Sequence, residues 1–291
     1  MPGKPPRRAN ALRVPYRSKF VVRPGHKVRL EEIDPAQTGK HASERDARAA
    51  IERDRERLEQ LQYLLYAEDR RSLLIVLQAL DAGGKDGTVR HVFGAFNPQG
   101  AYVHAFKVPT AEEAAHDFLW RVHAAVPKRG QIAIFNRSHY EDVLVPRVHR
   151  TLPRETIAKR YDRIVEFEKN LHQAGTRILK FFLHISREEQ LRRMRERIDD
   201  PHKQWKLNAG DFVERARWDD YRKAYEDALE ATSTHRAPWF VIPANHKWFR
   251  NLAVARIVAD ELDDLKMKFP KPPADLDAIR RAYEQAARDE R

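Results

Sequence analysis

Ser72-Leu-Leu-Ile-Val-Leu-Gln78 and the loop that follows it, Asp81-Ala-Gly-Gly-Lys-Asp-Gly-Thr88, decide the fold. The first stretch is almost continuously apolar, which is typical of a strand buried on both faces of a parallel sheet. The second holds three of the 11 glycines of the chain within five positions and precedes a helical pattern. Glycines let backbone N–H groups approach a phosphate, a helix N-terminus adds partial positive charge, and Lys85 can add a full one. The sequence therefore predicts a strand, a phosphate-binding loop and a helix in succession.

The loop departs from the common phosphate-binding pattern G-x-x-x-x-G-K-[ST]. Ala79 stands where that pattern has its first glycine, and Asp86 stands where it has Ser or Thr. The alternative is an ordinary glycine-containing turn with a surface lysine, and the strand before and the helix after favour the phosphate loop. We predict that Lys85 is catalytic. The other candidate nucleotide- or phosphate-binding residues of this loop are Gly83, Gly84, Asp86, Gly87 and Thr88.

Further strands and helices alternate along the chain. We expect strands over 101–106, 131–135, 177–184 and 238–242. We expect helices over 43–67, 110–125, 210–232 and 248–265, after Pro153 and after Ser186. This alternation predicts an α/β fold, a P-loop-kinase-like three-layer sandwich with a five-stranded parallel sheet, helices on both faces and a helical lid. Such sheets bind ligands beyond the carboxyl ends of their strands, so the loops there are the places to search.

Composition limits the classes of protein. The 291 residues are 42% hydrophobic, enough for a large core, and the formal net charge is +12, which favours polyanionic partners. The absence of cysteine excludes disulfides, thiolate catalysis and Cys-ligated zinc, and fits a cytoplasmic location. The longest apolar run is too short to span a bilayer, and no secretory signal is visible. We expect a basic, Pro-rich arm over 1–40, a kinase domain over 41–268 with its lid near 192–215, and a tail over 269–291.

The loop after the third strand has the sequence Asn136-Arg-Ser-His-Tyr-Glu-Asp142. A P-loop enzyme needs a carboxylate near this place to hold Mg²⁺, and Asp142, with Glu141 beside it, is the candidate. Arg137 can neutralise charge on a phosphoryl group. The alternative is a polar surface turn with a local Arg–Glu pair. His139 is expected to be a hydrogen-bonding structural residue.

A basic segment follows the fourth strand. Residues 192–206 hold more Lys and Arg than acids, and Pro201 ends the preceding helix. A mobile helical hairpin here would lie over the phosphate loop and exclude water, a competing acceptor. The alternative is a solvated helix face. We expect Trp205 to anchor the lid by packing, rather than to stack on a base.

Together, three stretches resemble polyphosphate kinase family 2: Asp81-Ala-Gly-Gly-Lys-Asp-Gly87, Phe135-Asn-Arg-Ser-His-Tyr140 and Asp200-Pro-His-Lys-Gln-Trp-Lys206. Ala237-Pro-Trp-Phe-Val241 resembles the last core strand of that family. The resemblance covers about 41–268. It implies reversible, in-line transfer of the terminal phosphate of polyphosphate to AMP or ADP, with Mg²⁺, or Mn²⁺ in its place, as the cofactor. It also implies a homodimer or homotetramer.

The resemblance also assigns roles to residues. It implies that Asp81 and Asp142 are the essential acidic residues and hold the metal, and that Lys85 and Arg137 hold phosphates. The pair Lys85-Asp86 and Glu141 resemble the class III branch, which accepts nucleoside mono- and diphosphates. The basic lid residues that would face polyphosphate are Arg197, Lys203 and Lys206.

Two other functions stay open. An ATP-dependent kinase of a nucleotide or small metabolite would use the same fold, because fold does not fix the substrate. A non-catalytic nucleic-acid-binding protein would use the basic surface alone, with steep salt dependence. No nucleic-acid-binding motif is recognisable, so we expect neither nucleic acid nor membrane as a partner.

Overall fold

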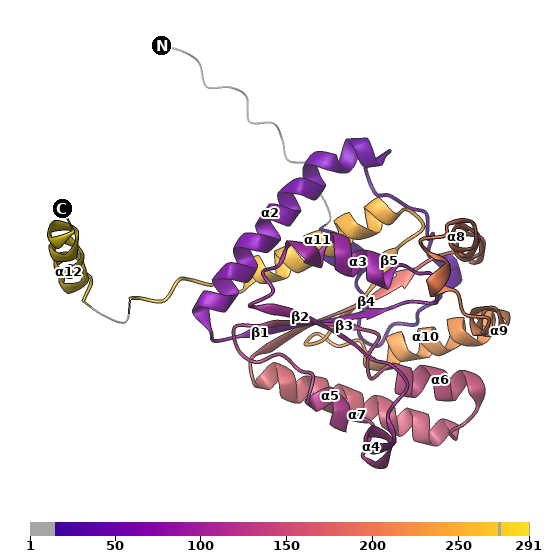
Figure 1. Ribbon diagram of the computed structural model, residues 1–291. Helices are drawn as coiled ribbons and strands as arrows, with labels where there is room; N and C mark the ends of the chain where they lie inside the picture. The colour runs from indigo at the N-terminus through magenta and orange to yellow at the C-terminus, as the bar shows by residue number, and fades with distance from the viewer. Residues whose placement is uncertain (1–14, 273–274, 291) are drawn as a thin grey trace, which may run out of the picture.

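The computed structural model describes residues 15–272 and 275–290 of the chain (Figure 1). Within them, five parallel strands form one sheet in the order β2-β3-β1-β4-β5. The strands are β1 (Ser72–Gln78), β2 (Ala101–Ala105), β3 (Ile132–Asn136), β4 (Thr176–His184) and β5 (Trp239–Pro243). Each lies within one residue of its predicted range at either end, and the predicted P-loop-kinase-like α/β fold is confirmed.

Helices cover both faces of the sheet. The α-helices are α1 (Tyr16–Phe20), α2 (Glu44–Glu68), α3 (Lys85–His91), α4 (Ala111–Ala115), α5 (Trp120–His123), α6 (Glu141–His149), α7 (Arg154–Gln173), α8 (Arg187–Asp199), α9 (Gly210–Ala216), α10 (Trp218–Thr232), α11 (Lys247–Asp264) and α12 (Leu276–Asp289). Short 3-10 turns are η1 (Leu30–Glu32), η2 (Phe93–Ala95) and η3 (Gln204–Lys206). Figure 1 shows α2, α3 and α11 on one face, and α5, α6, α7 and α10 on the other.

The central position of β1 in the sheet explains why its sequence is almost continuously apolar. Successive side chains of a strand point to opposite faces. Leu73 and Ile75 pack into the core beneath α2 and α11. Leu74 and Val76 pack into the core beneath α6, α7 and α10. Both faces are covered, so every residue of β1 is buried, and the loop that follows is held at a fixed edge of the sheet.

Two predicted helices are each divided. The helix expected over 110–125 is wrong as one element, because α4 and α5 are separated at 116–119, where Asp117 accepts a hydrogen bond from the backbone N–H of Leu119 at 3.0 Å. This side-chain turn competes with the helix. The helix expected over 210–232 is also divided, since Arg217 leaves the helical conformation between α9 and α10. As a result α9 belongs to the lid, with α8 and η3, while α10 packs on the core.

The described parts of the predicted arm (1–40) and tail (269–291) contain structure that we did not predict. Residues 1–14 of the expected arm lie outside the described residues, whereas Phe20, Val22 and Leu30 are buried on the sheet. The backbone N–H of Val22 donates to the carbonyl of Trp239 at 2.8 Å, which attaches this segment beside β5. The tail contains α12, for which we predicted no element; none of its described side chains is buried, and it stands apart from the sheet in Figure 1. No helix of the described chain combines the length and apolarity that crossing a membrane would need.

Candidate active site

The phosphate loop runs from Ala79 to Gly84, between β1 and α3. Gly84 has φ = 102°, in the left-handed region that favours glycine. A Cβ on Gly83 would lie 2.5 Å from the Cβ of Ala79 and 2.8 Å from the carbonyl oxygen of Leu80, so a larger residue cannot fit there without displacing the loop. The predicted glycine requirement therefore has a local cause in this tight turn.

Lys85 begins α3 and folds back over the loop. Its Nζ donates to the carbonyl oxygen of Ala79 at 2.8 Å. Burial lowers the pKa of Lys85 from its ordinary value, and the nearby charge of Arg137 lowers it further. The ammonium group is thus held among the loop, Arg137 and the acidic residues around them, where a phosphate would relieve the repulsion between the two cations.

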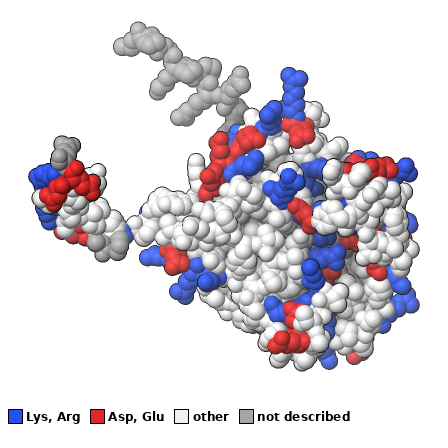
Figure 2. Space-filling model, in the orientation of Figure 1, with Lys and Arg blue, Asp and Glu red and all other residues white. Residues whose placement is uncertain are grey.

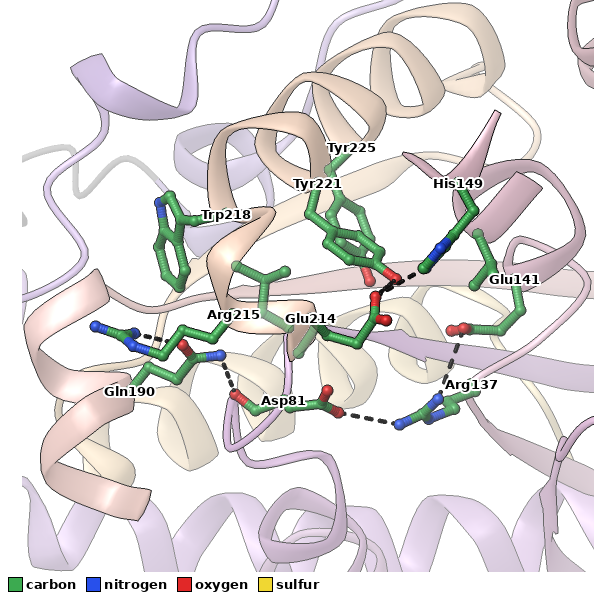
Figure 3. Close-up of a pocket in the computed structure, with 13 residues that line it drawn as sticks. Asp81, Arg137, Glu141, His149, Gln190, Glu214, Arg215, Trp218, Tyr221 and Tyr225 are labelled. Carbon is green, nitrogen blue, oxygen red and sulfur yellow. Dashed lines mark hydrogen bonds and ion pairs between the residues drawn. The ribbon is translucent and has the colours of Figure 1, made fainter. Parts of the chain in front are cut away.

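Arg137 joins this loop to the one that follows β3. Its backbone has φ = 62°, and its N–H donates to the carbonyl oxygen of Leu77 at 3.1 Å. The guanidinium lies between two carboxylates: Nη2 donates to Asp81 Oδ1 at 3.0 Å, and Nη1 lies 3.7 Å from Glu141 Oε2 (Figure 3). Burial disfavours the charged form of Arg137, but the negative charges of Glu141 and Asp81 outweigh the effect of burial and raise the pKa of Arg137. Asp81, Lys85, Arg137 and Glu141 therefore form one cluster, as predicted for the first three.

Glu141 is the first residue of α6 and is largely enclosed. Burial raises its pKa, although Arg137 and Lys85 act in the opposite direction, and the charge of Asp81 adds to the rise. With the amide of Gln78 oriented to satisfy both its atoms, its nitrogen donates to Glu141 Oε1 at 3.0 Å. A metal cation beside Asp81 and Glu141, in addition to Arg137 and Lys85, would offset the repulsion between these two carboxylates.

The structure does not bring Asp142 into this cluster. Consecutive residues of a helix point about 100° apart, so Glu141 and Asp142 cannot both face the loop. Asp142 Oδ2 accepts a hydrogen bond from the buried Arg121 at 3.1 Å, and its backbone carbonyl accepts one from Arg160. The position of Asp142 thus gives no support to its expected role as a metal ligand, and Glu141 is the better placed neighbour.

Asp86 and Thr88 occupy the start of α3. Asp86 accepts hydrogen bonds from Asn136 Nδ2 at 2.9 Å and from Lys206 Nζ at 3.5 Å. Burial opposes its ionisation, but the bond from Asn136 and the charge of Lys206 outweigh burial and hold its pKa below the ordinary value. Thr88 is fully buried and donates to the carbonyl oxygen of Gly84 at 3.2 Å. Thr88 therefore stabilises the loop from inside.

The lid brings the predicted basic residues over the phosphate loop. Arg197, Lys203 and Lys206 line the same cleft as the loop. Each has an acidic neighbour: Asp211 lies 3.7 Å from Arg197, Asp200 lies 2.5 Å from Lys203, and Asp86 lies 3.5 Å from Lys206. The last contact joins the lid directly to the start of α3, just after the loop.

Trp205 differs from its prediction. Its side chain is 77% exposed, and its indole N–H donates to the carbonyl oxygen of His202 at 3.0 Å within the lid itself. The expectation that it anchors the lid by packing is wrong, because it contacts no core. Its ring instead lies under the ammonium group of Lys206, 5.0 Å from Nζ to the ring centre.

Two cavities among the described residues meet at Asp81 and Arg137. The larger cleft, with a volume of about 1220 Å³, is lined by the phosphate loop, the basic lid residues and the first turn of α11. The smaller, about 220 Å³, lies between the loop and α6, α9 and α10, and Glu141 faces it. Asp81 and Arg137 line both. The cluster is therefore accessible from two sides, one lined by the lid cations and the other by Glu141.

Sequence reasoning missed the walls of the smaller cavity. In Figure 3, Tyr221 and His149 converge on Glu214, which belongs to the lid helix α9. The hydroxyl of Tyr221 donates to Glu214 Oε2 at 2.6 Å, and His149 Nε2 lies 3.0 Å from the same oxygen. Burial, and then the hydrogen bond to Glu214, raise the pKa of Tyr221. These residues are far apart in sequence, and no local motif joins them.

A second missed feature is a buried ion pair behind α6. Lys180 Nζ donates to Glu168 Oε2 at 2.6 Å, to the hydroxyl of Tyr140 at 2.9 Å and to the carbonyl oxygen of Thr232 at 2.8 Å. His139 is fully buried beside it, with Nε2 3.5 Å from Glu168, but neither ring nitrogen has a hydrogen-bond partner among the described residues, so the structure gives no support to its expected hydrogen-bonding role. A lone lysine in the apolar run of β4 was the available signal.

The side chains around the cluster offer oxygen ligands of the kind that Mg²⁺ prefers. Among residues 15–272 and 275–290, no cluster of three or more His, Asp or Glu side chains is arranged to hold a metal ion on its own. Mg²⁺ needs fewer protein ligands when phosphates are present, since it binds one or two carboxylates, phosphate oxygens and waters. Asp81 and Glu141 face the same cavity and repel each other, so this pair fits such an ion.

Charges on the visible surface are mixed. Figure 2 shows Lys and Arg interspersed with Asp and Glu over the face in view. The cations that line the large cleft include Lys85, Arg137, Arg197, Lys203 and Lys206.

Comparisons with known proteins show what this chain is similar to. The family model of polyphosphate kinase 2 matches residues 41–270. The AMP/ADP-polyphosphate phosphotransferase of Meiothermus ruber is 51% identical over 259 residues, which cover 87% of this chain and 96% of that protein. The ADP-polyphosphate phosphotransferase of Rhodopseudomonas palustris is 44% identical over 269 residues, covering 87% and 92%. The crystal structure of polyphosphate kinase 2 from Arthrobacter aurescens superimposes with a TM-score of 0.90 at 42% identity, covering 94% of this chain and 97% of that one.

Proposed function

The chain belongs to the polyphosphate kinase 2 family, and we propose that it transfers the terminal phosphate of polyphosphate to a nucleoside mono- or diphosphate. The reaction is reversible, since each direction breaks one phosphoanhydride bond and forms another. The names of the Meiothermus and Rhodopseudomonas relatives, one for AMP and ADP and the other for ADP, support nucleotides as the partners of polyphosphate. Membership of the class III branch stays a prediction, based on Lys85-Asp86 and Glu141.

The meeting of two cavities at Asp81 and Arg137 carries this proposal. Polyphosphate, a long polyanion, fits the large cleft with the lid residues Arg197, Lys203 and Lys206. The phosphate of the nucleotide fits the smaller cavity beside Glu141. The phosphoryl group then crosses at the cluster, where the two cavities share their lining.

The chemistry needs positioning and charge neutralisation more than covalent catalysis. A phosphate oxygen of the acceptor attacks the terminal phosphorus in line, and the bond from that phosphorus to the bridging oxygen of the chain breaks. Polyphosphate becomes one phosphate shorter, and AMP becomes ADP or ADP becomes ATP. Lys85 and Arg137 lie where they can neutralise the charge that accumulates on the transferring oxygens. Asp81 keeps Arg137 oriented toward both cavities.

Mg²⁺ would be held by Asp81 and Glu141 together with phosphate oxygens, and Mn²⁺ could replace it. When bound, it supplies a positive charge that draws the two phosphate groups together. This assignment replaces Asp142 with Glu141, because Asp142 is paired with Arg121 instead.

The lid gives the reaction protection from water. Lys206 already reaches Asp86, so a small movement of α8, η3 and α9 would close the cleft over a bound chain. Nucleotide substrates and the cysteine-free sequence are compatible with the cytoplasm, where we propose that the protein acts. A homodimer or homotetramer stays a prediction from the family resemblance.

The decisive experiment uses the purified wild-type protein with Mg²⁺, polyphosphate and either AMP or ADP, followed by nucleotide analysis. We expect ADP and ATP to form from AMP, and ATP to form from ADP, with both reactions stopped by a chelator. A parallel reaction with ATP as donor and no polyphosphate tests the rival kinase. Turnover with ATP alone, and none with polyphosphate, would overturn the proposal.

A further inference from the structure

Arg250 lies in the first turns of α11, pressed against the phosphate loop. Its side chain is 98% enclosed, since only 2% is exposed, yet it lines the large cleft. A Cβ on Gly84 would lie 1.9 Å from Arg250 Nη1, and a Cβ on Gly87 would lie 3.0 Å from Nη2. The two glycines therefore make room for this guanidinium beside the loop, in addition to shaping the loop itself.

No described carboxylate forms an ion pair with Arg250. Its Nε and Nη2 donate to Asn251 Oδ1, at 3.1 and 2.8 Å, so its hydrogen-bond partner is a neutral amide. Burial, and to a lesser extent the charge of Arg193, lower the pKa of Arg250 to about 9. An enclosed cation without a counter-charge is unfavourable, and an anion in the cleft would relieve the cost.

Several other cations of the same cleft are paired with carboxylates. Arg193 is also buried, but its Nε donates to Glu189 at 2.6 Å, and one of its Nη atoms donates to the carbonyl oxygen of Ala82 at 2.9 Å. Lys247, at the rim, pairs with Glu196 at 3.1 Å. Acidic residues are therefore present near the cleft, and their scarcity does not explain why Arg250 has no described carboxylate as a partner.

We propose that Arg250 is a phosphate-binding residue of the polyphosphate cleft, and that an internal phosphate of the bound chain supplies its missing counter-charge. The inference rests on the proposed use of polyphosphate and adds a binding residue outside the loop and the lid. Arg250 lies beside Gly84 and Gly87, whereas Arg137 pairs with Asp81 at the start of the loop, so Arg250 would hold a phosphate of the chain other than the one that is transferred. A planar guanidinium can donate two parallel hydrogen bonds to one phosphate, which suits this task.

The first variant is Arg250→Gln, with Lys247→Gln as its matched control. Both remove one positive charge from the same cleft, but Lys247 is exposed and already paired. Binding of tripolyphosphate is measured by calorimetry, and KM is measured separately for polyphosphate and for the nucleotide. We expect Arg250→Gln to weaken tripolyphosphate binding about tenfold to hundredfold, as for a lost hydrogen bond to a charged group, and to raise KM for polyphosphate more than KM for the nucleotide. Lys247→Gln should change both about twofold at most.

The second variant, Asn251→Asp, separates phosphate binding from a purely structural role. It keeps the shape of the side chain and gives Arg250 a carboxylate in the free protein. We expect the melting temperature of the free protein to rise and tripolyphosphate binding to weaken about tenfold, because the counter-charge is now built in. Asn208→Asp is its control, since it adds one negative charge to the same cleft without touching Arg250. This control should not raise the melting temperature and should weaken binding less.

The two pairs of variants distinguish phosphate binding by Arg250 from mere support of the loop. If Arg250 merely supports the loop, Asn251→Asp strengthens that support and leaves tripolyphosphate binding equal or tighter, which would overturn the proposal. Equal effects of Arg250→Gln and Lys247→Gln would overturn it as well. Should Arg250→Gln fail to fold, the comparison of Asn251→Asp with Asn208→Asp decides. Failure of the proposed function is distinct, because the wild-type protein would then show no turnover with polyphosphate at all.

Discussion

Lys180 and Arg250 are both buried cations within the same domain, but their surroundings differ. Lys180 is fully enclosed and is neutralised by Glu168, with Tyr140 and the carbonyl of Thr232 as further acceptors. Arg250 is almost as enclosed and has a neutral amide as its partner. The difference indicates what each charge is for. A charge that is compensated inside the protein holds the structure together, and a charge that is left uncompensated beside a cleft is available to a ligand.

The compensated pair also serves the site indirectly. Tyr140, which contacts both Lys180 and Glu168, immediately precedes Glu141, and its ring packs against Trp239 of β5. The ion pair thus fixes the loop after β3 against β4, β5 and α7. Since Arg137 and Glu141 lie in and just after this loop, their positions depend on a pair that touches neither cavity.

The largest expected effect tests the buried ion pair of Lys180 with Glu168. Glu168→Gln keeps the volume but leaves Lys180 charged, buried and without a counter-charge. We expect the free energy of unfolding to fall by about 3–5 kcal/mol, as measured by urea denaturation, because breaking a buried pair leaves an unsolvated charge. Arg250→Gln, measured in the same way, should cost far less, since its charge already lacks an acidic partner. Equal losses for the two variants would contradict the distinction.

The second prediction applies the same distinction to neighbouring acids of α6. Asp142 is compensated by Arg121, whereas Glu141 faces Asp81 across the smaller cavity. The acceptor oxygen of AMP stops one phosphate short of that of ADP, and Glu141, through Mg²⁺ or an ordered water, would hold the displaced α-phosphate. Glu141→Asn should therefore lower the rate with AMP about a hundredfold, as for loss of a charge-stabilising group, and the rate with ADP much less.

Rates for this test are measured at saturating polyphosphate and Mg²⁺. Asp142→Asn is the matched control, because it neutralises the adjacent carboxylate, and its effect on both acceptors should be small. If Glu141→Asn slows AMP and ADP by the same factor, Glu141 does not select the acceptor. A large loss in Asp142→Asn, with the fold intact, would restore the original assignment of Asp142 to the metal.

The smallest effect concerns an exposed cation of the lid. Lys203 has a side chain that is 53% exposed and pairs with Asp200, so it resembles neither buried cation. Lys203→Ala should raise KM for polyphosphate about threefold and KM for the nucleotide less, and the defect should depend on added salt because exposed charges are screened. The defect of Arg250→Gln should depend on salt less, since its charge is enclosed. Equal changes in both KM values for Lys203→Ala would instead favour a general closing role of the lid.

The sequence could predict features that depend on neighbouring residues, and it could not predict features that depend on contacts between distant parts of the chain. Strand β1 and the loop at Gly83 and Gly84 were predictable, because burial and tight turns leave a local pattern. The choice between Glu141 and Asp142 was not, since it depends on the residue at which α6 begins, and a shift of one residue turns a side chain by about 100°. Arg250 gave no local signal, since it is one of several charged residues of α11. Its importance comes from contact with glycines far away in the chain.

The shared lining of the two cavities has a kinetic consequence. Because the cavities approach Asp81 and Arg137 from different sides, donor and acceptor need not take turns in one place. We expect both to be bound at once, in a ternary complex, with no phosphorylated enzyme as an intermediate. Plots of reciprocal initial rate against reciprocal nucleotide concentration, at several fixed polyphosphate concentrations, should then intersect rather than run parallel.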